Sequence, residues 1–92
     1  MDITIHYTAH LKTAGGSAEQ TLRVEDGATV RECFETLCES IPVDLRNLLV
    51  DNDGKLRPAI LLCLDDEQIP LDDPAPVRPG AHITLLAAIS GG

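Results

Sequence analysis

The sequence predicts an α+β domain in which a mixed sheet of four to five strands carries one main helix across one face. Two short segments near the N-terminus alternate polar and apolar residues with a period of two, which is typical of half-buried strands. Only one longer stretch, residues 30–41, repeats apolar residues with the period of a helix. A chain of 92 residues is too short for a doubly wound sheet with helices on both faces.

The first two predicted strands lie close together in the chain. Residues 3–9 alternate apolar and polar side chains, and residues 21–24 do so again. Between them, residues 13–17 are Thr-Ala-Gly-Gly-Ser, a composition typical of turns. The two strands are therefore predicted to pair directly as a hairpin.

The main helix is predicted to begin after Thr29. Thr29 and Glu32 have the spacing of a capping box, in which each side chain accepts a hydrogen bond from the backbone at the start of a helix. Apolar residues then recur on one stripe as far as Ile41, and Pro42 ends the helix. A further short helical turn is predicted at residues 45–49.

The C-terminal half is predicted to contain three strands. Residues 51–54, Asp-Asn-Asp-Gly, indicate a tight turn. Residues 59–64 are apolar on both alternating faces, which is typical of a central strand. A short edge strand at residues 68–71, a proline-rich connection and a last strand at residues 82–89 follow.

The predicted order of strand, strand, helix, strand, short strand and strand is that of a β-grasp fold. One domain is expected to span residues 1–92, with a flexible C-terminal tail at residues 89–92. The helix is expected to pack on the sheet through a core of Ile3, Ile5, Leu22, Val24, Phe34, Leu37, Ile41, Ile83 and Leu85.

The composition excludes several classes of function. A net charge of −8 repels phosphate backbones and anionic lipids, so nucleic-acid and membrane-surface binding are not expected. The charge suits either a protein partner with a basic surface or simply a solvated acidic face. No apolar run approaches the roughly 20 residues of a membrane span, and the N-terminus lacks the pattern of a secretory signal. A cytoplasmic location is the expectation.

Metal and catalytic sites are not expected. Cys33 and Cys38 lie about 8.6 Å apart on the predicted helix, which is too far for a disulfide, so reduced core thiols are predicted. Aligning Gly54 with the glycine of a calcium loop places Leu49 and Ile60 at ligand positions, which leaves a structural turn as the better interpretation. No cysteine or histidine pair has zinc spacing, and no Ser-His-Asp or Cys-His arrangement is present. The chain is predicted not to be an enzyme by itself.

Four segments resemble the ThiS/MoaD family of ubiquitin-like sulfur carriers. They are Ile-Thr-Ile-His-Tyr-Thr-Ala-His-Leu-Lys at residues 3–12, Gly-Lys-Leu-Arg-Pro-Ala-Ile-Leu-Leu-Cys-Leu-Asp at residues 54–65, Arg-Pro-Gly-Ala-His-Ile-Thr-Leu-Leu at residues 78–86, and the terminal Ile-Ser-Gly-Gly. The first segment is similar to the first strand of MoaD-like members, the small subunits of molybdopterin synthase. The resemblance implies a β-grasp fold. It also implies activation by an E1-like adenylyltransferase of the MoeB/ThiF kind using ATP and magnesium, and a thiocarboxylate on the terminal glycine.

The tail chemistry also follows from the residues themselves. The carboxylate of Gly92 is a poor electrophile when ionised and must first be activated, most simply as an acyl-adenylate. Ser90, Gly91 and Gly92 are small, so this tail can thread a narrow channel of a partner protein. Sulfur in place of one oxygen then makes a soft nucleophile. The competing interpretation is that the two glycines are only a frayed chain end.

A docking patch for a partner is predicted on the sheet face away from the main helix, because a sheet with one helix leaves one face open. Its predicted members are Ile60, Leu62, Leu64, Leu86 and Ala88. The alternative is that the segment around residues 45–49 covers this face and no partner is needed.

Three functions therefore remain open. The first is a sulfur carrier, with molybdopterin synthesis as the preferred pathway and thiamine thiazole or cysteine synthesis as alternatives. It requires an adenylyltransferase, a sulfur donor enzyme and a downstream synthase subunit, and no stably bound cofactor. The second is a ubiquitin-like modifier conjugated to lysines, and the third is a β-grasp binding module with an idle tail.

Overall fold

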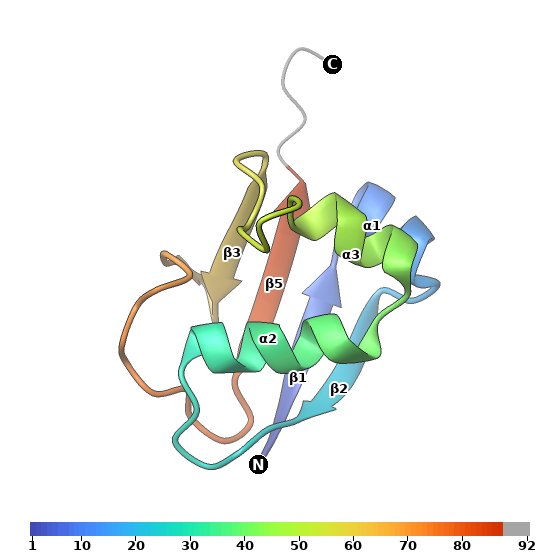
Figure 1. The fold of residues 1–92 in the computed structure, drawn as a ribbon. Helices are drawn as coiled ribbons and strands as arrows, with labels where there is room; N and C mark the ends of the chain where they lie inside the picture. The colour runs from blue at the N-terminus through green and yellow to red at the C-terminus, as the bar shows by residue number, and fades with distance from the viewer. Residues whose placement is uncertain (88–92) are drawn as a thin grey trace.

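The computed structural model describes residues 1–87, except for the side chains of residues 9, 10 and 15. The elements follow in the order β1 (Asp2–Tyr7), α1 (Ala9–Gly15), β2 (Glu19–Arg23), α2 (Val30–Ser40), α3 (Val43–Leu49), β3 (Ile60–Leu64), β4 (Glu67–Gln68) and β5 (His82–Ala87) (Figure 1). None of the described helices is long and apolar enough to cross a membrane.

The five strands form one mixed sheet in the order β2-β1-β5-β3-β4. β5 occupies the middle, parallel to β1 and antiparallel to β3. The prediction that residues 59–64 form a central strand is confirmed, because β3 pairs with β5 on one side and with the two-residue edge strand β4 on the other, although it begins one residue later, at Ile60. β4 is shorter than predicted and begins one residue earlier, since only Glu67 and Gln68 pair with β3.

The direct hairpin predicted for the first two strands is wrong, because the helix α1 lies between them. β1 ends at Tyr7, and Thr8 has the extended backbone of an N-cap residue. Gly16 ends α1 with a φ of 77°, a conformation that suits glycine, and its N–H donates to the carbonyl of Lys12 at 2.9 Å. Leu11 is buried in the core and holds α1 in place. β1 and β2 nevertheless pair antiparallel, as expected.

The main helix and the short second helix are confirmed. The Thr29 side chain accepts a hydrogen bond from the Glu32 N–H, and the Glu32 carboxylate accepts one from the Thr29 N–H at 3.0 Å, which completes the capping box. α2 ends at Ser40, just before Ile41 and Pro42. α3 begins two residues earlier than predicted, at Val43.

Replacing Thr29 with alanine is expected to lower the free energy of unfolding by about 1 kcal/mol, because the Glu32 N–H then has no capping acceptor. Urea unfolding followed by circular dichroism would measure the change. Thr29→Ser keeps the hydroxyl and is expected to retain most of the stability. Equal losses in both variants would contradict a role for the cap.

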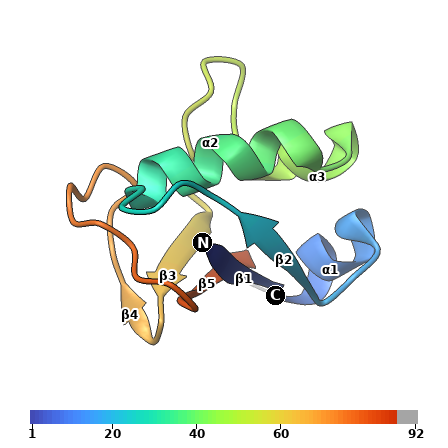
Figure 2. The same cartoon turned by 90° about the horizontal axis from the view of Figure 1, so that it is seen from below.

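All nine predicted core residues are buried. Both views place α2 and α3 on one side of the sheet (Figures 1 and 2). The core between them takes alternate residues of each strand, which are Ile3, Ile5 and Tyr7 of β1, Ile60 and Leu62 of β3, and Ile83 and Leu85 of β5. The predicted arrangement of a mixed sheet with a main helix across one face is thus confirmed.

Burial raises the pKa values of one tyrosine and two cysteines in and beside this core. The hydroxyl of Tyr7 donates a hydrogen bond to Gln20 Oε1 at 2.8 Å, and burial raises the pKa of Tyr7 to about 12. Burial also raises the pKa of the thiols of Cys33 and Cys38. Cys33 is fully buried and Cys38 is half-buried, and both are free. Raised pKa values make both thiols poor nucleophiles, which agrees with a packing role.

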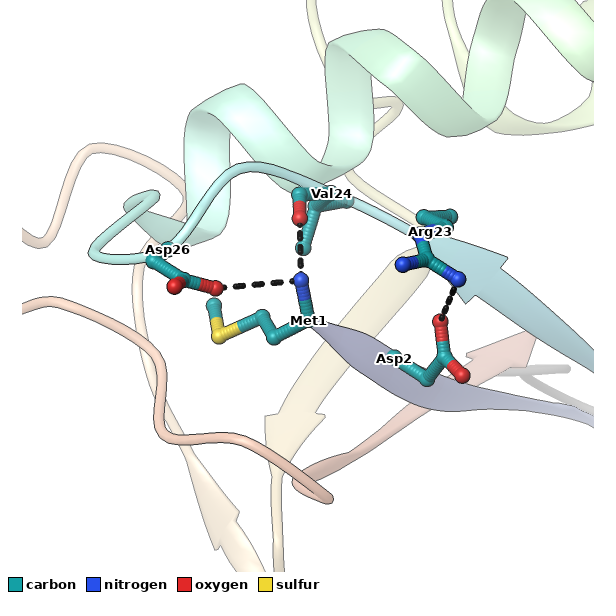
Figure 3. A network of polar contacts seen from close by, with 5 residues as sticks. All are labelled: Met1, Asp2, Arg23, Val24 and Asp26. Atoms are coloured by element: carbon teal, nitrogen blue, oxygen red, sulfur yellow. Dashed lines mark hydrogen bonds and ion pairs between the residues drawn. The ribbon is translucent and has the colours of Figure 1, made fainter.

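Polar contacts tie the start of β1 to the segment that follows β2 (Figure 3). The amino nitrogen of Met1 lies 2.7 Å from the carbonyl oxygen of Val24 and 3.1 Å from a carboxylate oxygen of Asp26. Arg23 and Asp2 face each other across the two strands, with a nitrogen and an oxygen 3.8 Å apart. Because this last pair is exposed, it adds little stability.

Candidate functional site

The predicted chemical site lies outside the described residues. Residues 88–92 include the predicted thiocarboxylate residue Gly92, the threading residues Gly91 and Ser90, and the patch residue Ala88. The structure does describe the strand that precedes them. The last pair of this strand joins Ala87 to the first residue of β3.

β5 is the middle strand of the sheet. It pairs with β1 on one side and with β3 on the other. At its centre, Leu85 is fully buried and pairs with Tyr7 of β1 and Leu62 of β3. The last residue of β5, Ala87, is thus held in a fixed position by the sheet. A partner that binds the sheet would bind at a defined distance from the start of the tail.

The predicted docking patch is mostly wrong, because three of its members face the helices. Ile60 and Leu62 are buried in the core beneath α2 and α3. Leu64 alternates onto the same side and packs against the core. Of the members that the structure describes, only Leu86 lies on the opposite face. The prediction assigned the wrong alternate residues of β3 to the open face. Because the residues on both faces of β3 are apolar, the sequence does not indicate which set is buried.

The face opposite the helices, which we call the open sheet face, has a half-buried apolar centre. Leu61 pairs with Leu86, and Cys63 pairs with Thr84. Leu61, Cys63 and Leu86 form the apolar strip of this face, and all three are half-buried. The strip lies on β3 and β5, next to the point where β5 leads into the tail.

No described helix covers the open sheet face (Figure 2). The alternative prediction, that residues around 45–49 pack there, is wrong. Leu45 and Leu49 of α3 are fully buried on the helix side of the sheet. Two other residues of α3, Val43 and Leu48, are exposed.

The part of the open sheet face beside the apolar strip is hollowed and polar. His6, His82, Thr84, Asp65 and Asp66 line a shallow depression of about 420 Å³. The Asp65 carboxylate accepts a hydrogen bond from the His82 N–H at 3.0 Å, and the Asp65 N–H donates to the His82 carbonyl at 2.7 Å. Sequence analysis missed this cluster, because its residues come from three distant segments and share no spacing.

The turn at residues 51–54 is a structural turn, as predicted. The Asp51 carboxylate accepts hydrogen bonds from the N–H groups of Lys55 at 3.1 Å and Asp53 at 2.9 Å. The bond from Lys55 contributes most to lowering the pKa of Asp51. Gly54 has a φ of 77°, which suits glycine. Among the side chains that the structure describes, no group of three His, Cys, Asp or Glu is placed to hold a metal ion.

Comparison with known proteins gives matches in structure alone. No model of a known protein family matches the chain, and no curated protein matches its sequence. SAMP1 from Haloferax volcanii has a TM-score of 0.89 and 24% identity, with all of both chains covered. A chain of the Amycolatopsis orientalis BexX/CysO complex has a TM-score of 0.70 and 28% identity, with 98% of this chain and 99% of that chain covered.

A third similar structure is also a protein complex. It contains subunits 1 and 2 of the molybdopterin-converting factor from Helicobacter pylori, with a TM-score of 0.65, 20% identity and all of both chains covered. The three similarities cover 98–100% of the chain, and they confirm the predicted β-grasp fold.

Proposed function

We propose that this chain, which has the fold of the ThiS/MoaD ubiquitin-like sulfur carriers, carries sulfur as a thiocarboxylate on Gly92. The observation that carries the proposal is the full-length likeness to carrier and modifier proteins in a chain that ends in Gly91-Gly92. An E1-like adenylyltransferase of the MoeB/ThiF kind would activate the carboxylate with ATP and magnesium. A sulfur donor enzyme would then supply the sulfur.

The open sheet face supports this role, because it offers a surface on which a partner could dock. In this proposal the adenylyltransferase supplies the chemistry of activation, and the chain supplies the carboxylate and a surface for docking. The open sheet face offers a partner the apolar strip Leu61, Cys63 and Leu86. Exposed carboxylates of Asp65 and Asp66 lie beside the strip. With a net charge of −8, the chain suits a partner surface with an apolar centre and a basic rim.

Two destinations for the sulfur compete. Molybdopterin synthesis has the support of the likeness to subunit 1 of a molybdopterin-converting factor, and a synthase subunit would be the receiver. The alternative is another biosynthetic pathway, such as cysteine or thiamine thiazole synthesis, and the higher identity of 28% to a chain of the BexX/CysO complex keeps the choice open.

A role as a protein modifier is the second candidate function. The structure of SAMP1, also called small archaeal modifier protein 1, matches this chain with a higher TM-score than the molybdopterin-converting factor does. In this case the activated Gly92 would form an isopeptide bond with a lysine of another protein instead of receiving sulfur for delivery.

A reconstituted reaction tests the proposal. The full chain is incubated with the adenylyltransferase of its own organism, ATP, magnesium and a sulfur donor, and its intact mass is then measured. A carrier gains the mass difference of one oxygen replaced by sulfur. A chain that is adenylated, takes up no sulfur and forms lysine-linked conjugates in its own cells is a modifier only. A chain that is never adenylated contradicts both functions.

A further inference from the structure

Two histidines that are 76 residues apart in the sequence meet on the open sheet face. His6 of β1 and His82 of β5 place Nε2 and Nδ1, respectively, 2.7 Å apart. Their rings are nearly parallel, with an interplanar angle of 17° and centroids 5.0 Å apart. β1 and β5 are adjacent and parallel, and His6 stands two residues further along the register than His82. The sheet itself therefore holds the two imidazoles together.

We propose that this pair binds a divalent transition-metal ion such as Zn²⁺ or Ni²⁺, with His6 Nε2 and His82 Nδ1 as the two protein ligands. Imidazole nitrogen is a preferred ligand of these ions. Two nitrogens bound to one tetrahedral ion at about 2.0–2.1 Å lie roughly 3.3 Å apart. The observed pair needs to open by about 0.6 Å to reach that separation. Because the two nitrogens now face each other in a hydrogen bond, both rings must also turn so that their lone pairs converge on the ion.

The surroundings of the pair also suit a cation. Glu19 Oε2 lies 3.4 Å from His6 Nδ1, the ring nitrogen that would not bind the metal. A carboxylate at that position orients a histidine ligand and increases its basicity. Asp65 and Asp66 line the same depression as the two rings, and their negative charge favours a divalent ion. The depression has room for water molecules at the remaining coordination positions.

The site is reachable from solvent. The side chain of His6 is 32% exposed, and His82 is exposed. On metal binding, the proton of the hydrogen bond between the two rings would move to the other nitrogen of its own ring, so that both facing nitrogens are free to bind the ion. The bound ion would add positive charge to an acidic region beside the apolar strip. It would thus alter the charge of the open sheet face. This inference does not depend on the proposed sulfur transfer.

Isothermal titration calorimetry of the full chain with ZnCl₂, NiCl₂ and MgCl₂ tests the site. One Zn²⁺ or Ni²⁺ per chain is expected to bind, whereas Mg²⁺, which prefers oxygen ligands, is not. His6→Gln and His82→Gln are each expected to weaken binding at least about tenfold, the lower limit for disturbing a metal site. Circular dichroism of both variants shows whether they fold.

Two control variants separate this site from others. His10→Gln removes the third histidine and Cys63→Ser removes the thiol of the open sheet face, and both are expected to leave binding unchanged. The proposal is overturned if the unmodified chain binds neither ion. It is also overturned if folded His6→Gln and His82→Gln variants bind as well as the original, or if Cys63→Ser alone abolishes binding.

Discussion

Adding one alanine after Gly92 is expected to reduce the yield of thiocarboxylate about 100-fold, the loss that follows when a reacting group is misplaced by about an ångström. The added residue moves the free carboxylate away from the position that Gly92 would occupy beside the nucleotide. It also brings a Cβ into a channel that suits glycine. Intact mass after the reconstituted reaction would measure the yield.

The matched control for this extension is the same chain with Ser90→Ala, which changes the tail without lengthening it or blocking Gly92. It is expected to react at nearly the original rate. Circular dichroism is expected to be the same for all three chains. If the extended chain accumulates thiocarboxylate as fast as the original, the terminal carboxylate of Gly92 is not the reacting group.

Leu85→Ala is expected to lower the free energy of unfolding by about 2–5 kcal/mol. Leu85 is fully buried at the centre of the middle strand, so its removal leaves a cavity between the sheet and the helices. A loss of this size is a large part of the roughly 5–15 kcal/mol that stabilises a domain. Since the chain has no tryptophan, urea unfolding followed by far-ultraviolet circular dichroism is the suitable measurement.

Leu86→Ala is the matched control, one position along the same strand but on the open sheet face. Because Leu86 is half-buried, its loss is expected to cost about 1 kcal/mol or less of stability. The same variant is expected to weaken binding to the adenylyltransferase about tenfold, or ~1.4 kcal/mol. Equal destabilisation by the two variants would contradict the assignment of the two faces. If Leu86→Ala binds the adenylyltransferase as tightly as the original chain, the apolar strip is not part of the interface.

In the proposed function, docking and chemistry would use different parts of the chain. The open sheet face provides the apolar strip and the acidic rim, and β5 leads from that face into the tail. In the proposed function, a partner that binds the strip would contact the chain close to Ala87, the last residue of β5. The helices α2 and α3 take no part in this surface, since they cover the other side of the sheet (Figure 2).

Local patterns in the sequence were sufficient for much of the fold. The capping box of Thr29 and Glu32 and the period of apolar residues placed α2 nearly to the residue. The alternation of apolar and polar residues at 3–7 and 82–87 correctly predicted which faces of β1 and β5 are buried. The same reasoning failed for α1, because Thr-Ala-Gly-Gly-Ser suits a hairpin turn as well as the C-terminal end of a short helix that glycine closes.

The sequence by itself determined the mixed sheet, the main helix, the core and the diglycine end, since each depends on the periodicity or chemistry of neighbouring residues. Only the tertiary structure decided which face of β3 is open, because a strand that is apolar on both sides takes its orientation from pairing with β5. The contact between His6 and His82 is likewise visible only in the tertiary structure. Contacts between residues so far apart depend on the order and register of strands, which local sequence patterns do not encode.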